Sequence, residues 1–254
     1  MATIATRLTN TGNLLVNGTI DEFTGAPVID GNLKVWLDAG QTASYPGSGS
    51  IWYDLSGNGS NAVLYNAVAY NNDQSAMNFT GGYANISSAN AANVTTTSAV
   101  TVSVWFNATT VDTTYRRIVS RDSFPTQNWY IEFDGGSVGN VFSYSGTAAT
   151  GNTPISGNIW YNLTLTANAS TVTLYKNGSQ VAQNGLATSF IANTAGIGIG
   201  ADNNGGSNFL GNISQIMIYN RVLTAAEVLQ NYNALAPRYG LTANTSGNTL
   251  QRTL

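Results

Sequence analysis

The stretch "WYNLTLTANASTVTLYKNGSQVAQ", residues 160–183, decides the fold class of this protein. It contains two runs of alternating apolar and polar residues, joined by a polar turn around Asn168, and the second run leads into Asn177-Gly178. Asn-Gly between two such runs is a strong signal for a β-hairpin, because both central residues of a type I′ turn need positive φ. The stretch therefore predicts antiparallel strands connected by tight turns.

The same period of two recurs along the chain. In "AVTVSVWFNAT", residues 99–109, the apolar residues that share one face are Val100, Val102, Val104 and Phe106. Further short runs, separated by turns rich in Gly and Asn, are "RRIVSRD", "WYIEFDG", "AGIGIGA" and "ISQIMIYN". Many short strands and turns over about 200 residues predict an all-β protein with an antiparallel sandwich.

One helix is expected near the C-terminus. In "FLGNISQIMIYNRVLTAAEVLQNYNAL", residues 209–235, an apolar strand runs into a helical pattern. Thr224 and Glu227 have the spacing of a capping box, in which the Thr hydroxyl accepts from the Glu amide and the Glu carboxylate bonds back. We expect the helix to begin at Ala225, to pack an apolar stripe on the sandwich, and to end near Pro237.

The composition excludes several classes of function. Hydrophobic residues make up 43% of the 254 residues, which is enough for a core, but charged residues make up only 8%. An average soluble domain has about a quarter charged residues, so this surface must consist largely of Asn, Thr, Ser and Gly. The formal net charge of −3 and the lack of a basic run argue against nucleic acid or an anionic membrane as partner.

The sequence contains neither Cys nor His, which excludes disulfides, thiol nucleophiles, imidazole bases and ordinary zinc sites. The N-terminal "MATIATRLTNTGNLL" has no cationic start followed by an apolar core, and no stretch reaches membrane-spanning length. We therefore expect a protein made in the cytoplasm without an export signal. Its extracellular type of surface fits a virion component released by lysis, with non-classical secretion as the alternative.

Four segments in order resemble a known family: "LKVWLDAGQTASYPGSGSIWYDLSGNGSNAVLYN", "TVSVWFNA", "LYKNGSQVA" and "FLGNISQIMIYNRVLTAAEVLQNYN". They are similar to the concanavalin A-like lectin/glucanase superfamily, in its laminin-G-like jelly-roll branch. The opening "YPGSGSIWYDLSGNG" resembles versions found in tailed-phage structural proteins. The resemblance implies a two-sheet jelly roll, a frequent carbohydrate-binding role and sometimes one bound calcium ion. The expected domains are an N-terminal attachment arm at 1–30, the jelly roll at 31–238 and a C-terminal tail at 239–254.

The superfamily also contains glucanases, whose chemistry needs two carboxylates about 5 to 9 Å apart. The nearest pattern is "WYIEFDGGSV", in which Glu132 and Asp134 would share one face of a strand. The β-glucanase motif carries a further Glu a few residues on, and here Gly135, Gly136 and Ser137 follow. We therefore expect no catalytic residues and no enzyme activity, with both carboxylates facing solvent before a turn.

Calcium is the metal that the resemblance implies, and it takes carboxylate, amide and backbone oxygens. Two loops, "YDLSGNGSN" and "GADNNGGSN", offer such oxygens, and the candidate ligands are Asp54, Asn58, Asn61, Asp202, Asn203 and Asn204. The same residues could form ordinary turns, because Asx side chains bond to their own backbone and glycines supply positive φ. Both interpretations stay open at the level of sequence, and no further cofactor is expected.

A sugar site would need aromatic faces and amides that are exposed together. The aromatic candidates in or near loops are Tyr45, Trp52, Tyr53, Trp129 and Tyr144. Packing is the alternative for this group, because family members use residues at Trp52 and Tyr53 to hold the long opening loop. The tryptophans expected in the core, from their strand positions in the family, are Trp36, Trp105 and Trp160.

Three functions compete: a phage virion protein that displays a jelly roll, a free carbohydrate-binding module, and a glycosidase. We expect the first, as a capsid decoration or a tail or fibre component located on the virion. Residues 1–30 would be its attachment arm, since apolar residues such as Ile4 and Leu14 could pair as strands with a neighbouring chain. The expected partners are other virion proteins, further copies in a homo-oligomer, and surface glycans.

Overall fold

The computed structural model describes residues 14–16, 19–21, 26–94, 98–123, 126–145, 148–185 and 194–244. The predicted arm, 1–30, and the predicted tail, 239–254, lie partly outside these ranges. Within the arm, β1 (Leu14–Val16) pairs with β2 (Thr19–Asp21) in a short antiparallel ladder.

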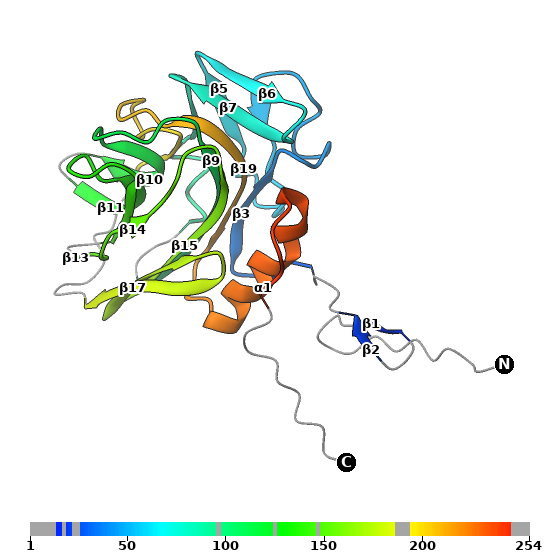
Figure 1. Cartoon of the computed structure of the whole chain (residues 1–254). Helices are drawn as coiled ribbons and strands as arrows, with labels where there is room; N and C mark the ends of the chain where they lie inside the picture. Colours follow the sequence, from blue (N-terminus) through cyan, green and yellow to red (C-terminus); the bar gives the residue numbers. More distant parts are fainter. Residues whose placement is uncertain are drawn as a thin grey trace.

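Two antiparallel sheets form a sandwich (Figure 1). Sheet 1 consists, in spatial order, of β17 (Ser179–Gly185), β16 (Thr171–Lys176), β15 (Trp160–Asn168), β9 (Ala99–Ala108), β19 (Leu210–Tyr219), β7 (Ala76–Thr80) and β6 (Val68–Asn71), with β3 (Leu33–Asp38) also beside β19. Sheet 2 consists of β13 (Ala148–Ala149), β12 (Asn140–Ser145), β11 (Thr126–Phe133), β10 (Arg116–Ser123), β18 (Ile197–Ile199), β8 (Tyr83–Ile86), β5 (Ala62–Tyr65) and β4 (Ile51–Trp52), with β14 (Thr153–Pro154) beside β12. The predicted all-β, two-sheet antiparallel jelly roll is confirmed.

The core lies between the sheets and follows the predicted alternation. On β9, Val100, Val102, Val104 and Phe106 are fully buried in the cluster that both sheets share. Burying one large apolar side chain stabilises a fold by about 1.5 to 3 kcal/mol. The other face of β9 is buried as well, so alternation in this strand separates two packed layers rather than core from solvent.

The helix α1 (Ala225–Leu235) and the following 3-10 helix η1 (Ala236–Tyr239) form the layer outside sheet 1. In Figure 1, α1 and the strands β10 and β11 lie on opposite sides of β9 and β19. Trp105, on the outer face of β9, stacks on Tyr232 with ring centroids 5.6 Å apart and on Tyr239 at 4.5 Å. Helix and sheet are therefore joined by an aromatic cluster, and Trp105 is buried in this second layer.

Two local predictions are confirmed in detail. Thr224 is the N-cap of α1, and its hydroxyl accepts from the Glu227 amide while the Glu227 carboxylate accepts from the Thr224 amide. In the turn between β16 and β17, Asn177 and Gly178 have φ values of 51° and 77°. Both signals depend on residues close together in the sequence, which explains why the sequence predicts them.

Candidate functional site

The opening loop between β4 and β5 is organised by the carboxylate of Asp54. Its Oδ1 accepts from the backbone N–H of Trp36 at 2.9 Å and of Ser56 at 3.0 Å. Its Oδ2 accepts from the Ser60 N–H at 3.1 Å and from the Ser56 hydroxyl at 2.7 Å. The carboxylate therefore ties this loop to β3.

The two asparagines predicted beside Asp54 take part in the same loop. The Asn61 Oδ1 accepts from the Asp54 N–H at 2.8 Å. The Asn58 Nδ2 donates to the carbonyl of Leu33 at 3.0 Å. The structure thus brings Asp54 and Asn61 together as partners in a hydrogen bond across the loop, while the bond from the Ser56 N–H to Asp54 forms an Asx-type turn.

The loop after β18 is built in a similar way. The Asp202 Oδ1 accepts from the N–H groups of Asn204 and Gly206, both at 2.8 Å. The Asn203 Oδ1 accepts from the Nδ2 of Asn85, on β8, at 2.8 Å. This loop consequently lies on the outer face of sheet 2, next to β8.

In the Asp54 loop, the carboxylate oxygens are already engaged by other groups of the protein. The carboxylate oxygens of Asp54 are occupied by backbone and hydroxyl donors, and a cation at either oxygen would have to displace them. Within the described ranges, no group of three or more acidic, Cys or His side chains is placed to hold a metal ion. We therefore expect no effect of calcium at Asp54, and a chelation experiment can test the calcium ion that the family resemblance implies.

The predicted sugar-binding aromatics do not form one site. Trp52 and Trp129 are both 0% exposed and pack in the core between the sheets, which corrects their assignment to a sugar site. Tyr45 is also buried, and its hydroxyl donates to the Gly49 carbonyl at 2.8 Å. Tyr53 is 43% exposed. The side chain of Tyr144 lies outside the described residues.

The sequence led us to expect that Glu132 faces solvent, and this expectation is wrong. The side chain is buried, with 4% of the residue exposed. It lies opposite Arg117 in the ladder of β10 and β11, and its Oε2 is 3.0 Å from the Arg117 Nε. The Arg117 guanidinium carbon lies 3.4 Å from the ring centroid of Tyr130. Asp134 accepts from the Gly136 N–H and the Asn152 Nδ2. An ion-paired, buried carboxylate is a poor general acid, since the cation stabilises its charged form.

An exposed apolar patch lies elsewhere, on the outer face of sheet 2 over β4, β5 and β8. The ladder places Ile51 opposite Val63 and Tyr65 opposite Tyr83, while the alternate residues of these strands face the core. The Tyr65 and Tyr83 rings are stacked, with centroids 4.9 Å apart and planes 15° from parallel. Tyr65 is 41% exposed and Ile51 36%. We call Ile51, Val63, Tyr65 and Tyr83 the tyrosine patch.

Sequence reasoning missed Tyr65 and Tyr83. The alternation in "AVLY", residues 62–65, places Tyr65 on the face of Val63, but it does not say which face the second sheet covers. The stacked pair also needs the register of β5 against β8, which joins positions far apart in the chain.

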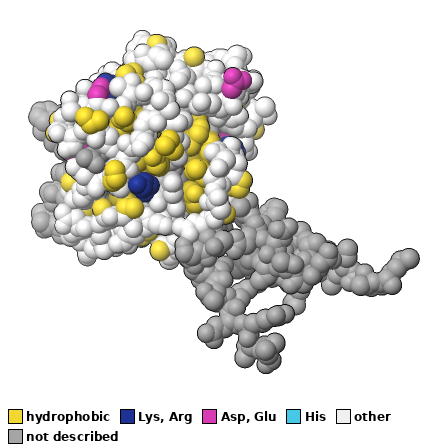
Figure 2. Space-filling view, in the orientation of Figure 1, with side chains coloured by type: hydrophobic (Ala, Val, Ile, Leu, Met, Phe, Trp, Pro, Cys, Tyr) yellow, Lys and Arg dark blue, Asp and Glu magenta, His cyan; other side chains and the backbone are white. Residues whose placement is uncertain are grey.

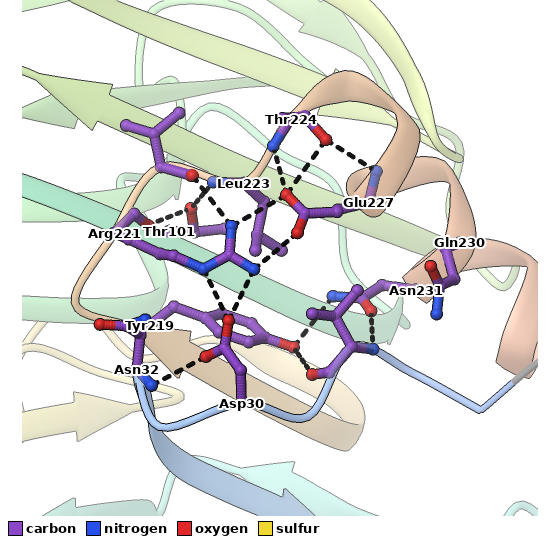
Figure 3. A network of polar contacts seen from close by, with 12 residues as sticks. Asp30, Asn32, Thr101, Tyr219, Arg221, Leu223, Thr224, Glu227, Gln230 and Asn231 are labelled. Atoms are coloured by element: carbon purple, nitrogen blue, oxygen red, sulfur yellow. Dashed lines mark hydrogen bonds and ion pairs between the residues drawn. The ribbon is translucent and has the colours of Figure 1, made fainter. Parts of the chain in front are cut away.

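On the opposite face of the sandwich, the chain segment before β3 is fastened to α1 (Figure 3). The Val28 N–H donates to the Asn231 Oδ1 at 2.7 Å, and the Tyr219 hydroxyl donates to the Val28 carbonyl at 2.7 Å. The Arg221 guanidinium bonds to Asp30 at 2.8 Å and to Glu227 at 2.6 Å. These contacts fix the first residues of the body against the helix.

The charges in this network shift the pKa of both carboxyls. Hydrogen bonds from Arg221 hold the pKa of Glu227 at about 2, although burial opposes the shift. Burial acts to raise the pKa of Asp30, but the hydrogen bonds from Asn32 and Arg221 outweigh it, so that pKa is lowered. Burial raises the pKa of the Tyr219 hydroxyl.

Both ends of the described body meet α1. The Gln230 Nε2 donates to the Ala26 carbonyl at 3.0 Å. At the other end, the Asn233 Nδ2 donates to the Asn244 carbonyl at 3.1 Å, and the Asn244 N–H donates to the Asn233 Oδ1 at 2.7 Å. The flanking segments therefore join the jelly roll on the helix side, opposite to the tyrosine patch.

Comparison with known proteins agrees with this architecture. A laminin-G-type family described as the concanavalin A-like lectin/glucanases superfamily matches residues 80–229. This chain belongs to the concanavalin A-like lectin/glucanase superfamily. The family resemblance expected from the four sequence segments is thereby confirmed, whereas the tailed-phage context stays a prediction. No curated protein matches the sequence.

Solved structures of toxin binding domains share the fold. The binding domain of Paraclostridial mosquitocidal protein 1 is 20% identical with a TM-score of 0.64, covering 83% of this chain and 55% of that one. A botulinum neurotoxin type C structure, described in terms of cell entry and interaction with two ganglioside molecules, is 13% identical with a TM-score of 0.63, covering 82% and 52%. This superfamily member thus spans about half the length of these structures. None of the helices in the described ranges has the length and apolar character needed to cross a membrane.

Proposed function

We propose that this protein is a non-catalytic, carbohydrate-binding jelly roll that a tailed-phage particle displays on its surface. One observation carries the proposal. The tyrosine patch lies on the outer face of sheet 2, and both described chain ends lie on α1, outside sheet 1. A module attached through its ends would present the patch away from the attachment.

The chemistry of the patch supports sugar as the ligand. Tyrosine rings bury the apolar C–H face of a sugar ring, and nearby amides bond its hydroxyls. The Asn85–Asn203 amide pair lies directly beside the patch, because Asn85 is the ladder partner of Val63. Figure 2 shows one face of the molecule, on which charged side chains are few among polar and hydrophobic ones. A neutral polar surface of this kind suits a neutral polar ligand.

The related folds add support at the level of the superfamily. Cell entry of botulinum neurotoxin type C depends on interaction with ganglioside molecules, which carry sugars. The mosquitocidal protein structure is likewise a binding domain. A jelly roll that binds rather than catalyses is consistent with the buried ion pair of Glu132 and Arg117.

The attachment side is assigned to the flanking segments. Residues 1–25 precede the fastened stretch at Val28 and Asp30, and they hold the apolar residues expected to pair with another chain. We assign their partner as another virion protein or a second copy of this chain. We propose the virion location because residues 45–59 resemble tailed-phage structural proteins.

Two measurements on the full chain test this proposal. The purified protein should bind immobilised oligosaccharides on a glycan array, and antibodies against it should label particles of the phage that encodes it. Glycan binding without particle labelling would instead favour a free carbohydrate-binding module. Particle labelling without any glycan binding would leave a structural role and refute the lectin function.

A further inference from the structure

We infer that the exposed part of the Tyr65 ring, on the side away from Tyr83, is the stacking subsite for one pyranose ring of a neutral glycan. This inference rests on the proposed carbohydrate binding and deepens it. It assigns the subsite and the class of sugar, and none of the aromatic residues predicted from the sequence is its central residue.

The first step is the layered arrangement of the rings. Tyr83 covers one face of the Tyr65 ring, with centroids 4.9 Å apart and planes 15° from parallel. The backbone of Gly205 lies against Tyr83 on the loop side, since a Cβ added at Gly205 would be 2.6 Å from the Tyr83 Cε1. Tyr83 is thus held between this loop and Tyr65, and the exposed area of Tyr65 lies on the remainder of its ring.

The second step is a polar group beside Tyr83, on the side of the 202–206 loop. Asn85 follows Tyr83 by two positions on β8, so its side chain lies on the same face about 7 Å along the strand. Its Nδ2 donates to the Asn203 Oδ1 at 2.8 Å, which orients the Asn203 amide. Among the described residues, no protein acceptor binds the Asn203 Nδ2. Because this loop lies on the far side of Tyr83 from Tyr65, the donor would serve a neighbouring sugar unit rather than the ring stacked on Tyr65.

The third step concerns the charge of the glycan that the patch can accept. Residues 46–66, 80–86 and 198–208, which contain the patch and its border, include no Lys or Arg to pair with a sulfate or a carboxylate. On the border, the Asp202 Oδ1 already accepts two backbone N–H groups. The cation that reaches this border, Arg116 at the Asn208 carbonyl, is already paired with Asp112, so an anionic glycan would have to bury its charge without a free partner, which is unfavourable. The patch therefore selects a neutral glycan.

The fourth step concerns the extent of the apolar surface, which limits how many sugar rings can bind. Val63 and Ile51 continue the apolar floor from Tyr65 across β5 to the edge strand β4, and the exposed Tyr53 follows Ile51 by two residues. Neighbouring strands are about 4.8 Å apart, which is close to the width of one sugar ring. More than one ring fits on this floor, so affinity should rise with the length of the oligosaccharide.

The experiment compares the full chain with single variants, using neutral pentasaccharides of glucose, mannose and N-acetylglucosamine as probes, and sialyllactose and a heparin pentasaccharide as anionic probes. Tyr65→Ala should weaken binding of the neutral probe about tenfold or more, because the stacking face is lost. Tyr65→Phe keeps the ring and should bind within about threefold of the unchanged protein. Tyr115→Ala is the matched control, since Tyr115 is exposed but lies outside the patch.

Saturation-transfer NMR provides the second readout. The C–H protons on one face of the bound sugar should receive transfer from a tyrosine ring, and this signal should disappear in Tyr65→Ala. Thermal unfolding of each variant separates loss of binding from loss of folding.

Each outcome has a distinct meaning. Equal binding by the unchanged protein and by folded Tyr65→Ala would overturn the subsite and leave the proposed function standing. Binding of anionic probes alone would overturn the neutral class. If the unchanged protein binds none of the glycans, the proposed function fails, and the subsite fails with it.

Discussion

Arg221 and Asp30 form an ion pair although 191 residues separate them, with the Arg221 Nε 2.8 Å from the Asp30 Oδ2. The same guanidinium bonds to both oxygens of Glu227, in the first turn of α1, at 2.9 and 2.6 Å. One cation therefore joins the segment before β3, the chain after β19 and the start of the helix. The segment that contains Asp30 is fixed against the helix at this point.

This network should make stability depend on pH in the acid range. The pKa of Glu227 is about 2 and that of Asp30 is lowered, so both carboxyls bind fewer protons in the folded than in the unfolded protein. Their contribution is present above about pH 5 and is lost as the pH falls towards about 2. Urea unfolding across this range should show a smaller loss of stability in Glu227→Gln than in the unchanged protein. Identical pH profiles would contradict the contribution.

The N-terminal cap of α1 should make a measurable contribution to the free energy of unfolding. Thr224→Ala removes the hydroxyl that accepts from the Glu227 amide and should lower the free energy of unfolding by about 1 kcal/mol. Thr224→Ser keeps the acceptor and is the control, with a change of a few tenths of a kcal/mol at most. Equal stability of all three proteins would show that the capping bond does not support the helix.

The Asp54 carboxylate should stabilise the folded protein even when no metal ion is present. Asp54→Ala leaves the N–H groups of Trp36, Ser56 and Ser60 without their acceptor and should cost more than about 2 kcal/mol. The melting temperature of the unchanged protein should be the same in chelator and in millimolar calcium, because the carboxylate is already occupied. A clear rise with calcium would instead indicate a bound ion, since a ligand that binds the folded form raises its stability.

The attachment arm can be tested by two deletions. Removing residues 1–25 should leave a soluble, cooperatively folding jelly roll that no longer assembles onto particles. Removing residues 1–31 should also lower the melting temperature, since the contacts of Val28 with Asn231 and Tyr219 and of Asp30 with Arg221 are lost. Normal incorporation of the shorter deletion into particles would refute the arm.

Hydrolysis of β-glucans should be absent. Glu132 is buried and paired with Arg117, and Gly135, Gly136 and Ser137 follow Asp134 where the β-glucanase motif carries a further Glu, so the pair of carboxylates that glycoside hydrolysis needs is incomplete in this strand. Release of reducing ends from β-glucan should equal the background in both the unchanged protein and Glu132→Gln. Activity that the substitution abolishes would overturn the non-catalytic assignment.

The sequence predicts those features of this protein that depend on residues close together in the chain. The Asn177-Gly178 turn needs positive φ at two adjacent positions, and the Thr224–Glu227 cap needs a spacing of three. The alternation in β9 likewise places its valines on one face. Local backbone geometry decides all three, and the resemblance to the superfamily rests on such local patterns in a fixed order.

The candidate site depends on tertiary structure, because alternation does not tell which face another layer covers. Trp52, on β4 of sheet 2, is buried in the core between the sheets although it borders an exposed loop, and Glu132 is buried opposite Arg117 of the neighbouring strand. Tyr65 and Tyr83 become a stacked pair only through the register of β5 against β8. The free energy that selects this register comes from burial summed over both sheets, and no single stretch of sequence contains it.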